Sequence, residues 1–150
     1  MSMFSSMGIT SSALTAQRLR MDVISSNMAN ADTTRGKLVN GEWQPYKRKM
    51  VVLEPKTNSF SSHFQNAIGN DYASNGVKVT KIIDDDKTPS KLVYDPENPD
   101  ANQDGYVSLP NVDPLREMVD LMSATRSYEA NVTVFNSSKS MMMKALEIGK

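Results

Sequence analysis

A regular apolar pattern near the C-terminal end constrains the fold of this chain more than any other feature. Its positions alternate three and four residues apart for four heptads, the spacing of a coiled-coil seam. Only two positions are polar, Thr125 and Lys139. The C-terminal seam consists of Met118, Leu121, Thr125, Tyr128, Val132, Phe135, Lys139, Met142 and Leu146. Asp113 is a good N-cap and Pro114 a favoured first helical residue, so the sequence predicts a helix from there almost to the end of the chain.

The length of this helix indicates that it needs partners. At 1.5 Å per residue it extends for roughly 50 Å. A chain of 150 residues forms one domain with a radius of gyration of about 15 Å. A globule of that size cannot cover the whole seam. We therefore expect a structural assembly subunit whose seam meets other chains.

A second amphipathic helix is predicted over residues 9–30. Leu14, Met21 and Met28 recur every seven residues, and Ile24 lies beside them. We expect residues 1–30 and 113–150 to pair as a coiled-coil-like α domain. Because isolated helices with such faces are marginal in water, both termini are expected to be poorly ordered in the monomer and to fold on assembly.

The middle segment, residues 31–112, is polar and rich in turn residues. This composition predicts that the segment forms a small, irregular β insert with a mobile loop near 55–76. The fold class is therefore α+β. Four short strands are predicted, at Tyr46–Leu53, Val77–Ile83, Lys91–Tyr94 and Tyr106–Leu109.

Composition argues against several classes of partner. Seventeen basic and seventeen acidic residues leave no net charge, which disfavours nucleic acid and polybasic membrane binding. Cysteine is absent, so disulfides and thiolate zinc sites are excluded. We recognise no cleavable signal peptide and no run of about 20 apolar residues for membrane insertion.

Catalytic signals are weak, and we expect no enzyme, no cofactor and no small-molecule substrate. His63 is the only histidine and lies in the polar loop, away from any acidic cluster. No G-x-S-x-G nucleophile elbow is present. The acidic run Asp84–Asp86 is interpreted as a solvated turn.

One segment resembles the first half of a calcium loop. Asp100, Asn102 and Asp104 occupy positions 1, 3 and 5, with Gly105 at position 6. Position 12, which should be a bidentate acid, is Asn111. We therefore interpret the segment as a tight turn and expect no metal site.

Asn27 and Asn30 bracket the end of the first predicted helix. One interpretation is C-terminal capping, because asparagine tolerates the left-handed conformation. The other is that a buried amide fixes the register between packed helices, as a single seam asparagine does in coiled coils. Both can hold together.

The residues from Ser26 to Gly36 resemble the N-terminal signature of bacterial flagellar rod and hook proteins. The signature positions in this chain are Asn27, Ala29, Asn30, Thr33 and Gly36, while Ser26 replaces the first asparagine of the pattern. The resemblance continues through the middle segment and is specific to the proximal rod subtype. The segments that carry it are Pro45-Tyr46, Gly76-Val77, Tyr94-Asp95-Pro96, Gly105-Tyr106-Val107, Pro110-Asn111-Val112 and Ala124 to Asn131.

This resemblance implies a structural subunit of the basal-body proximal rod. The chain would leave the cell through the flagellar type III export apparatus, stack through its terminal helices with other rod subunits and the rod-base adaptor, and transmit torque. The rod would span the periplasm or cell wall. Three alternatives remain open from the residues alone: a solitary coiled-coil adaptor, a calcium-binding module and a cell-wall hydrolase.

Overall fold

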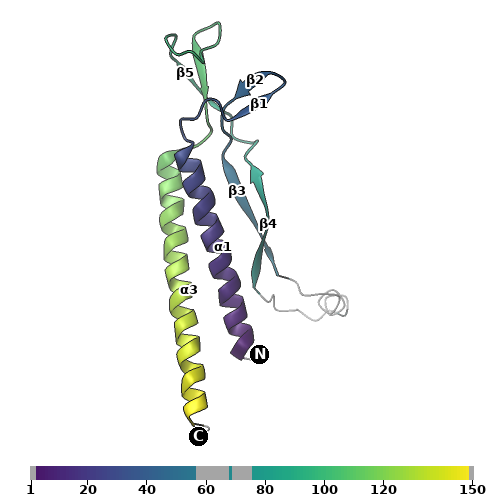
Figure 1. The fold of residues 1–150 in the computed structure, drawn as a ribbon, viewed down its shortest axis with the longest axis vertical. Helices are drawn as coiled ribbons and strands as arrows, with labels where there is room; N and C mark the ends of the chain where they lie inside the picture. The colour runs from purple at the N-terminus through teal and green to yellow at the C-terminus, as the bar shows by residue number, and fades with distance from the viewer. Residues whose placement is uncertain (1–2, 57–67, 69–75, 149–150) are drawn as a thin grey trace. The chain divides into compact units, whose positions relative to one another are not determined.

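The computed structural model describes residues 3–56, 68 and 76–148, and it confirms the α+β class. Two long helices begin and end the described chain, and six short strands lie between them in sequence (Figure 1). The elements are α1 (Met3–Ala29), β1 (Lys37–Val39), β2 (Glu42–Gln44), β3 (Lys49–Pro55), β4 (Val77–Asp84), β5 (Lys91–Tyr94), β6 (Tyr106–Leu109) and α3 (Pro114–Ile148).

The chain divides into two compact units. Unit 1 comprises residues 1–19, 52–81 and 124–150, and unit 2 comprises residues 20–51 and 82–123. The elements α1, β3, β4 and α3 each contribute residues to both units.

Side-chain hydrogen bonds mark the start of α3 and the end of α1. At the start of α3, the Asp113 carboxylate accepts a hydrogen bond from the Leu115 backbone N–H at 3.1 Å, which confirms the predicted N-cap. At the end of α1, the Asn30 side-chain amide donates to the Ser26 carbonyl at 2.8 Å. The same Ser26 carbonyl also accepts the Asn30 backbone N–H at 3.2 Å. Neither Asn27 nor Asn30 has a positive φ, so the predicted left-handed capping conformation is wrong.

The strands form three two-stranded sheets, β1–β2, β3–β4 and β5–β6. Strands β5 and β6 match their predicted bounds and pair antiparallel, with Tyr94 opposite Tyr106 and their rings in an edge-to-face contact at 5.3 Å. β3 begins three residues later than predicted. The Tyr46 N–H donates to the Thr33 carbonyl and the Arg48 N–H to the Asn111 side chain, so this backbone is already bonded outside the sheet.

The hairpin β1–β2 was not predicted. Its turn is Asn40-Gly41, and both residues have positive φ, 53° and 89°. An Asn-Gly pair with these angles is the usual two-residue hairpin turn. The strands were missed because each is only three residues long and shows no alternation.

In unit 1, α1 and the start of β4 approach closely. The Ser12 hydroxyl donates to the Ile9 carbonyl and accepts from the Val77 N–H at 3.2 Å. Gly76 has a φ of 110°, and a Cβ there would collide with the Ser12 hydroxyl. Glycine is therefore required at this contact for both reasons. The loop predicted over 55–76, including His63, lies outside the described residues except for Pro55, Lys56, Ile68 and Gly76.

Candidate functional site

A buried amide lies at the centre of unit 2. Asn27, on α1, is 1% exposed. Its Oδ1 accepts hydrogen bonds from the Tyr46 hydroxyl at 3.0 Å and the Lys49 N–H at 2.9 Å. Its Nδ2 donates to the Lys49 carbonyl at 2.9 Å and to Glu117 Oε2 at 3.1 Å. Both acceptor and both donor positions of the amide are used, so no other side chain of this size could replace it.

Glu117, the α3 partner of Asn27, is fully buried. Its Oε1 accepts a hydrogen bond from Arg48 Nε at 2.5 Å. Arg48 also lies 3.4 Å from Asp120, whose other oxygen is 3.7 Å from Arg20 on α1. We call Arg20, Asn27, Tyr46, Arg48, Lys49, Glu117 and Asp120 the buried junction. It links α1, the segment before β3 and α3 within unit 2. Asn27 and Glu117 are buried and therefore costly to leave unpaired, whereas Arg20 and Asp120 are partly exposed and Lys49 takes part through its backbone.

A second network extends the junction toward the end of β4. Asn111 Oδ1 accepts from the Arg48 N–H at 2.7 Å, and its Nδ2 donates to the carbonyls of Asp85 and Thr88. The Asp85 carboxylate accepts from the Thr88 hydroxyl and from the backbone N–H groups of Lys87 and Thr88. The Thr88 hydroxyl bond is the main cause that lowers the pKa of Asp85 below its ordinary value of 3.8.

Asp100, in the segment that resembles half a calcium loop, has protein partners. Its carboxylate accepts from the Arg35 guanidinium, with Nε at 2.7 Å, and from the Thr34 hydroxyl at 2.6 Å. The Arg35 bond, followed by the Thr34 bond, lowers the pKa of Asp100 below 3.8. The Asn102 side chain accepts from the N–H groups of Asp104 and Tyr106, which closes the turn. Among the described residues, no group of three acids, histidines or cysteines could hold a metal ion.

These two carboxyls predict acid sensitivity of unit 2. Because their folded pKa values are lowered, the stability that they contribute is present above pH 4 and is lost as the pH falls through the folded values. Trp43, the only tryptophan, lines a cavity together with Asp100 and reports on this unit. We expect the urea midpoint followed by Trp43 fluorescence to fall between pH 5 and pH 3. Asp100→Asn should lower the midpoint at pH 7 and weaken its pH dependence. An unchanged pH dependence would contradict the assignment.

The family-signature residues lie at or beside the junction. Asn27 forms its centre. Asn30 follows the end of α1, where its Nδ2 donates to the Ser26 carbonyl and its Oδ1 accepts from the Thr33 hydroxyl at 3.3 Å. The Gly36 N–H donates to the Gln44 carbonyl, and a Cβ on Gly36 would lie 2.7 Å from Tyr46 backbone atoms, which cannot move aside. Ala29 is exposed at the end of α1, and nothing in the structure explains its identity.

The residues of α3 differ in burial, and we describe them as three rows along the helix. The inner row, Glu117, Ala124, Asn131 and Ser138, is the most buried. The shared row, Leu121, Tyr128, Phe135 and Met142, is half-buried and belongs to the predicted seam. The outer row holds the remaining seam positions. Met118, Lys139 and Leu146 are exposed, Leu146 to 71%, whereas Thr125 and Val132 are half-buried. On α1, Ile24 is buried, whereas Leu14, Met21 and Met28 are half-buried.

The apolar pattern did not reveal the inner row because its residues are polar or small. Glu117, Ala124, Asn131 and Ser138 recur every seven residues and still occupy the most buried face of α3. Arg48, Asp120 and Asn111 were missed for the same reason: no local pattern marks a polar side chain whose partners are distant in sequence. A seven-residue repeat of small and polar residues beside an apolar row was the only available signal.

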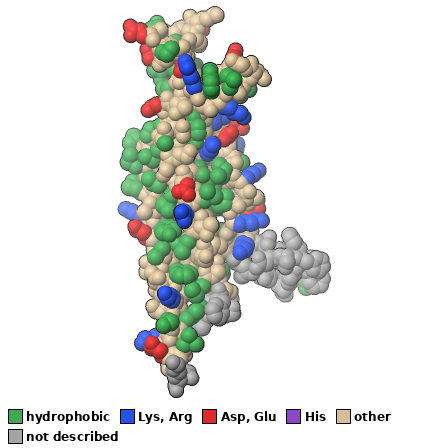
Figure 2. Space-filling view, viewed as in Figure 1, with side chains coloured by type: hydrophobic (Ala, Val, Ile, Leu, Met, Phe, Trp, Pro, Cys, Tyr) green, Lys and Arg blue, Asp and Glu red, His purple; other side chains and the backbone are tan. Residues whose placement is uncertain are grey.

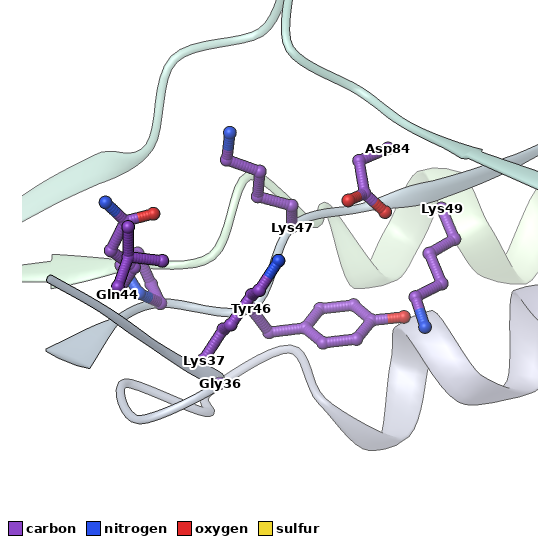
Figure 3. Close-up of a pocket in the computed structure, with 9 residues that line it drawn as sticks. Gly36, Lys37, Gln44, Tyr46, Lys47, Lys49 and Asp84 are labelled. Carbon is purple, nitrogen blue, oxygen red and sulfur yellow. The ribbon is translucent and has the colours of Figure 1, made fainter.

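A cationic pocket lies beside the junction in unit 2. It has a volume of about 430 Å³, and Lys37, Lys47 and Lys49 line it with Asp84 and Tyr46 (Figure 3). Lys47 pairs with Asp86 at 2.6 Å, and this bond raises the pKa of Lys47. We call this cavity the lysine pocket.

Large apolar side chains remain at the surface of α3. Hydrophobic side chains, drawn in green, are visible over much of the face in view (Figure 2). Four of them lie at helical spacing on its first two turns, within unit 2. They are Leu115, Met118, Val119 and Met122, each between 47% and 74% exposed. None of the described helices is long and apolar enough to cross a membrane.

Comparison with known proteins assigns the family. Residues 7–36 match a model described as flagella basal body rod protein, and residues 103–148 match one described as the C-terminal part of the flagellar basal body rod FlgEFG proteins. The flagellar basal-body rod protein FlgC of Bacillus subtilis is 64% identical over the full length of both chains. The FlgC proteins of Borreliella burgdorferi and Salmonella typhimurium are each 46% identical, over 99% and 95% of this chain and 98% and 94% of their own length.

These similarities bear out the resemblance drawn from the signature and middle segments. The relatives are named as flagellar basal-body rod proteins, a family not known to be enzymatic, which supports the structural interpretation over the hydrolase. They also place the chain at the flagellar basal body. The chain belongs to the FlgC family of flagellar basal-body rod proteins.

Proposed function

We propose that this chain is a subunit of the proximal rod that assembles with copies of itself and with other rod subunits through its terminal helices. In this proposal residues 1–30 and 113–150 form a coiled-coil-like domain, and residues 31–112 form the β-rich remainder. Contacts that repeat without closing a ring build a helical tube. Such a tube can transmit torque.

The observation that carries the proposal is the apolar surface left on α3. Seam residues Met118 and Leu146 are 47% and 71% exposed, and neighbouring Met143 and Ile148 are 55% and 86% exposed. Exposed apolar residues at this density along one helix are typical of a surface that a partner covers. The inner row is the most buried row of α3 within the single chain. We propose that the outer row is buried between chains.

The buried junction supports a role in torque transmission. Asn27, Arg48 and Glu117 join three segments through bonds between a buried amide, a buried carboxylate and a guanidinium. Such satisfied polar networks resist small displacements, because any shift leaves a buried group without its partner. We propose that unit 2 is the stiff part of the subunit under load.

Export through the type III apparatus would require that the chain unfold readily. Only six hydrophobic residues of the described chain are buried, and there is no cysteine to form a disulfide. We propose that residues 3–19 and 124–148, outside the junction, become ordered on assembly. Circular dichroism of dilute monomer tests this. We expect a helix content well below the 27 and 35 residues of α1 and α3, and full content with a cooperative melt would contradict it.

Leu146→Asp tests the outer row directly. Because Leu146 is 71% exposed in the single chain, we expect the variant to melt like the parent monomer but to abolish swimming. A charge buried at an interface costs several kcal/mol, repeated in every subunit. Phe135→Asp in the half-buried shared row should also abolish swimming. Leu146→Met, which keeps an apolar side chain, is the control and should swim. Normal swimming of Leu146→Asp would refute the outer-row interface.

Two further partners are proposed. The rod-base adaptor and the export apparatus are expected to contact the terminal helices. A solitary coiled-coil adaptor is the alternative that the same helices would serve. Pull-down of the full-length chain against other rod subunits separates the two. Retention of rod subunits supports the rod subunit, and retention of none supports the adaptor.

A further inference from the structure

The lysine pocket has more positive charge than the chain itself neutralises. Among the described residues, three lysines line it, and Asp84 is the only acid. Lys47 is paired with Asp86. Lys37 and Lys49 form no ion pair with any described residue, and the Lys49 ammonium lies 5.7 Å from the centre of the Tyr46 ring. Two ammonium groups are thus available to an anionic partner.

An acidic loop elsewhere in unit 2 has the complementary excess. Residues 95–104 contain four acids, Asp95, Glu97, Asp100 and Asp104, and no lysine, arginine or histidine. Asp100 is bonded to Arg35 and Thr34. Glu97 and Asp104 are exposed and form no ion pair with any described residue. We call residues 95–104 the acidic loop.

The acidic loop is fixed by its own hydrogen bonds, so its two available carboxylates project from a defined backbone. The Asp95 N–H donates to the Gly105 carbonyl at 2.9 Å, and the Asn102 N–H donates to the Tyr106 carbonyl at 2.9 Å. The Asn98 side chain bridges Asp95 and the Asp100 N–H. A preorganised loop loses little conformational entropy on binding, which favours its use as a recognition element.

We propose that the acidic loop of one copy occupies the lysine pocket of a second copy. This inference rests on the proposed function, in which copies of this chain adjoin one another. The two surfaces differ, so the contact is heterologous and can repeat from copy to copy. The chain has no net charge, so copies do not repel each other overall while these two patches attract.

Zero-length carbodiimide cross-linking of the full-length chain tests this contact. An equal mixture of ¹⁴N- and ¹⁵N-labelled protein distinguishes links between copies from links within a copy. We expect mixed-isotope peptides that join Lys37 or Lys49 to Glu97 or Asp104. Their yield should fall at least tenfold in 1 M salt, where the screening length is only about 3 Å.

Charge exchange supplies the specific control. Lys37→Glu combined with Lys49→Glu should remove the mixed-isotope links, and adding Glu97→Lys and Asp104→Lys should restore them with the two partners reversed. Lys81→Glu, at an exposed lysine outside the pocket, should leave the links unchanged. Links from Lys37 and Lys49 to other acids, or no mixed links at all, would overturn the proposal. Loss of swimming in Leu146→Asp is independent of this result, so the two proposals fail separately.

Discussion

Glu117→Ala will lower the free energy of unfolding of unit 2 by about 3–5 kcal/mol. The side chain is fully buried, and its removal leaves the Arg48 guanidinium, 15% exposed, with only the more distant Asp120. It also removes one of the two acceptors of the Asn27 amide. Urea unfolding followed by Trp43 fluorescence measures the effect, because Trp43 lies in the same unit.

The control for this variant is Glu129→Ala, at an exposed glutamate of the same helix, for which we expect a change below about 0.5 kcal/mol. A double-mutant cycle with Arg48→Ala isolates the ion pair, and the coupling should be about 0.5–3 kcal/mol. Equal midpoints for Glu117→Ala and Glu129→Ala would show that the junction does not stabilise the unit. In the cell, Glu117→Ala should reduce swimming even if the protein is exported.

Asn27→Asp will lower the free energy of unfolding of unit 2 as much as Glu117→Ala does, although it only replaces the side-chain NH2 group with an oxygen. The new oxygen would replace a nitrogen that donates to the Lys49 carbonyl at 2.9 Å and to the Glu117 carboxylate at 3.1 Å. Two hydrogen bonds become repulsive contacts, one of them between like charges in a buried site. We expect a loss of about 3–5 kcal/mol at pH 7, measured by the same urea titration.

The pH dependence of this variant gives a second, independent readout. Burial and the neighbouring Glu117 raise the pKa of the introduced carboxyl above that of the unfolded chain. Its penalty is therefore present at neutral pH and shrinks as the pH falls and the carboxyl becomes protonated. The parent protein changes in the opposite direction, because Asp85 and Asp100 have lowered pKa values. Asn136→Asp, at an exposed asparagine of α3, is the matched control and should behave like the parent. A parallel decline of both variants with pH would contradict the geometry at Asn27.

Local sequence patterns predicted the helix and the strands whose bounds are set by neighbouring residues in the chain. The N-cap Asp113 and the first-turn Pro114 set the start of α3, and its apolar period set the extent. Strands β5 and β6 were predicted within their bounds because turn residues delimit them on both sides. The Asn40-Gly41 turn is an equally local signal, but it did not predict a hairpin because the three-residue strands beside it have no period of their own.

The start of β3 could not be predicted in this way. The residues before Lys49 have a strand-like sequence, yet their backbone groups bond to Thr33 and Asn111, which are far away in the chain. Strand propensity describes a residue and its neighbours, whereas the partner of a backbone N–H is decided by the fold. The same limit applies to the acidic loop, whose Asp100 pairs with Arg35 rather than completing a cation site.

The sequence by itself determined two long helices, a β-rich middle segment and the family, because helix periods, caps and signature residues are local and readable. Only the tertiary structure decided which face of α3 is buried within the chain. That face contains Glu117, Asn131 and Ser138. All three are polar, so a search for apolar residues does not identify them. A glutamate can be the most buried side chain of a protein only where an arginine and an amide from distant segments meet it, and those partners exist only in the folded chain.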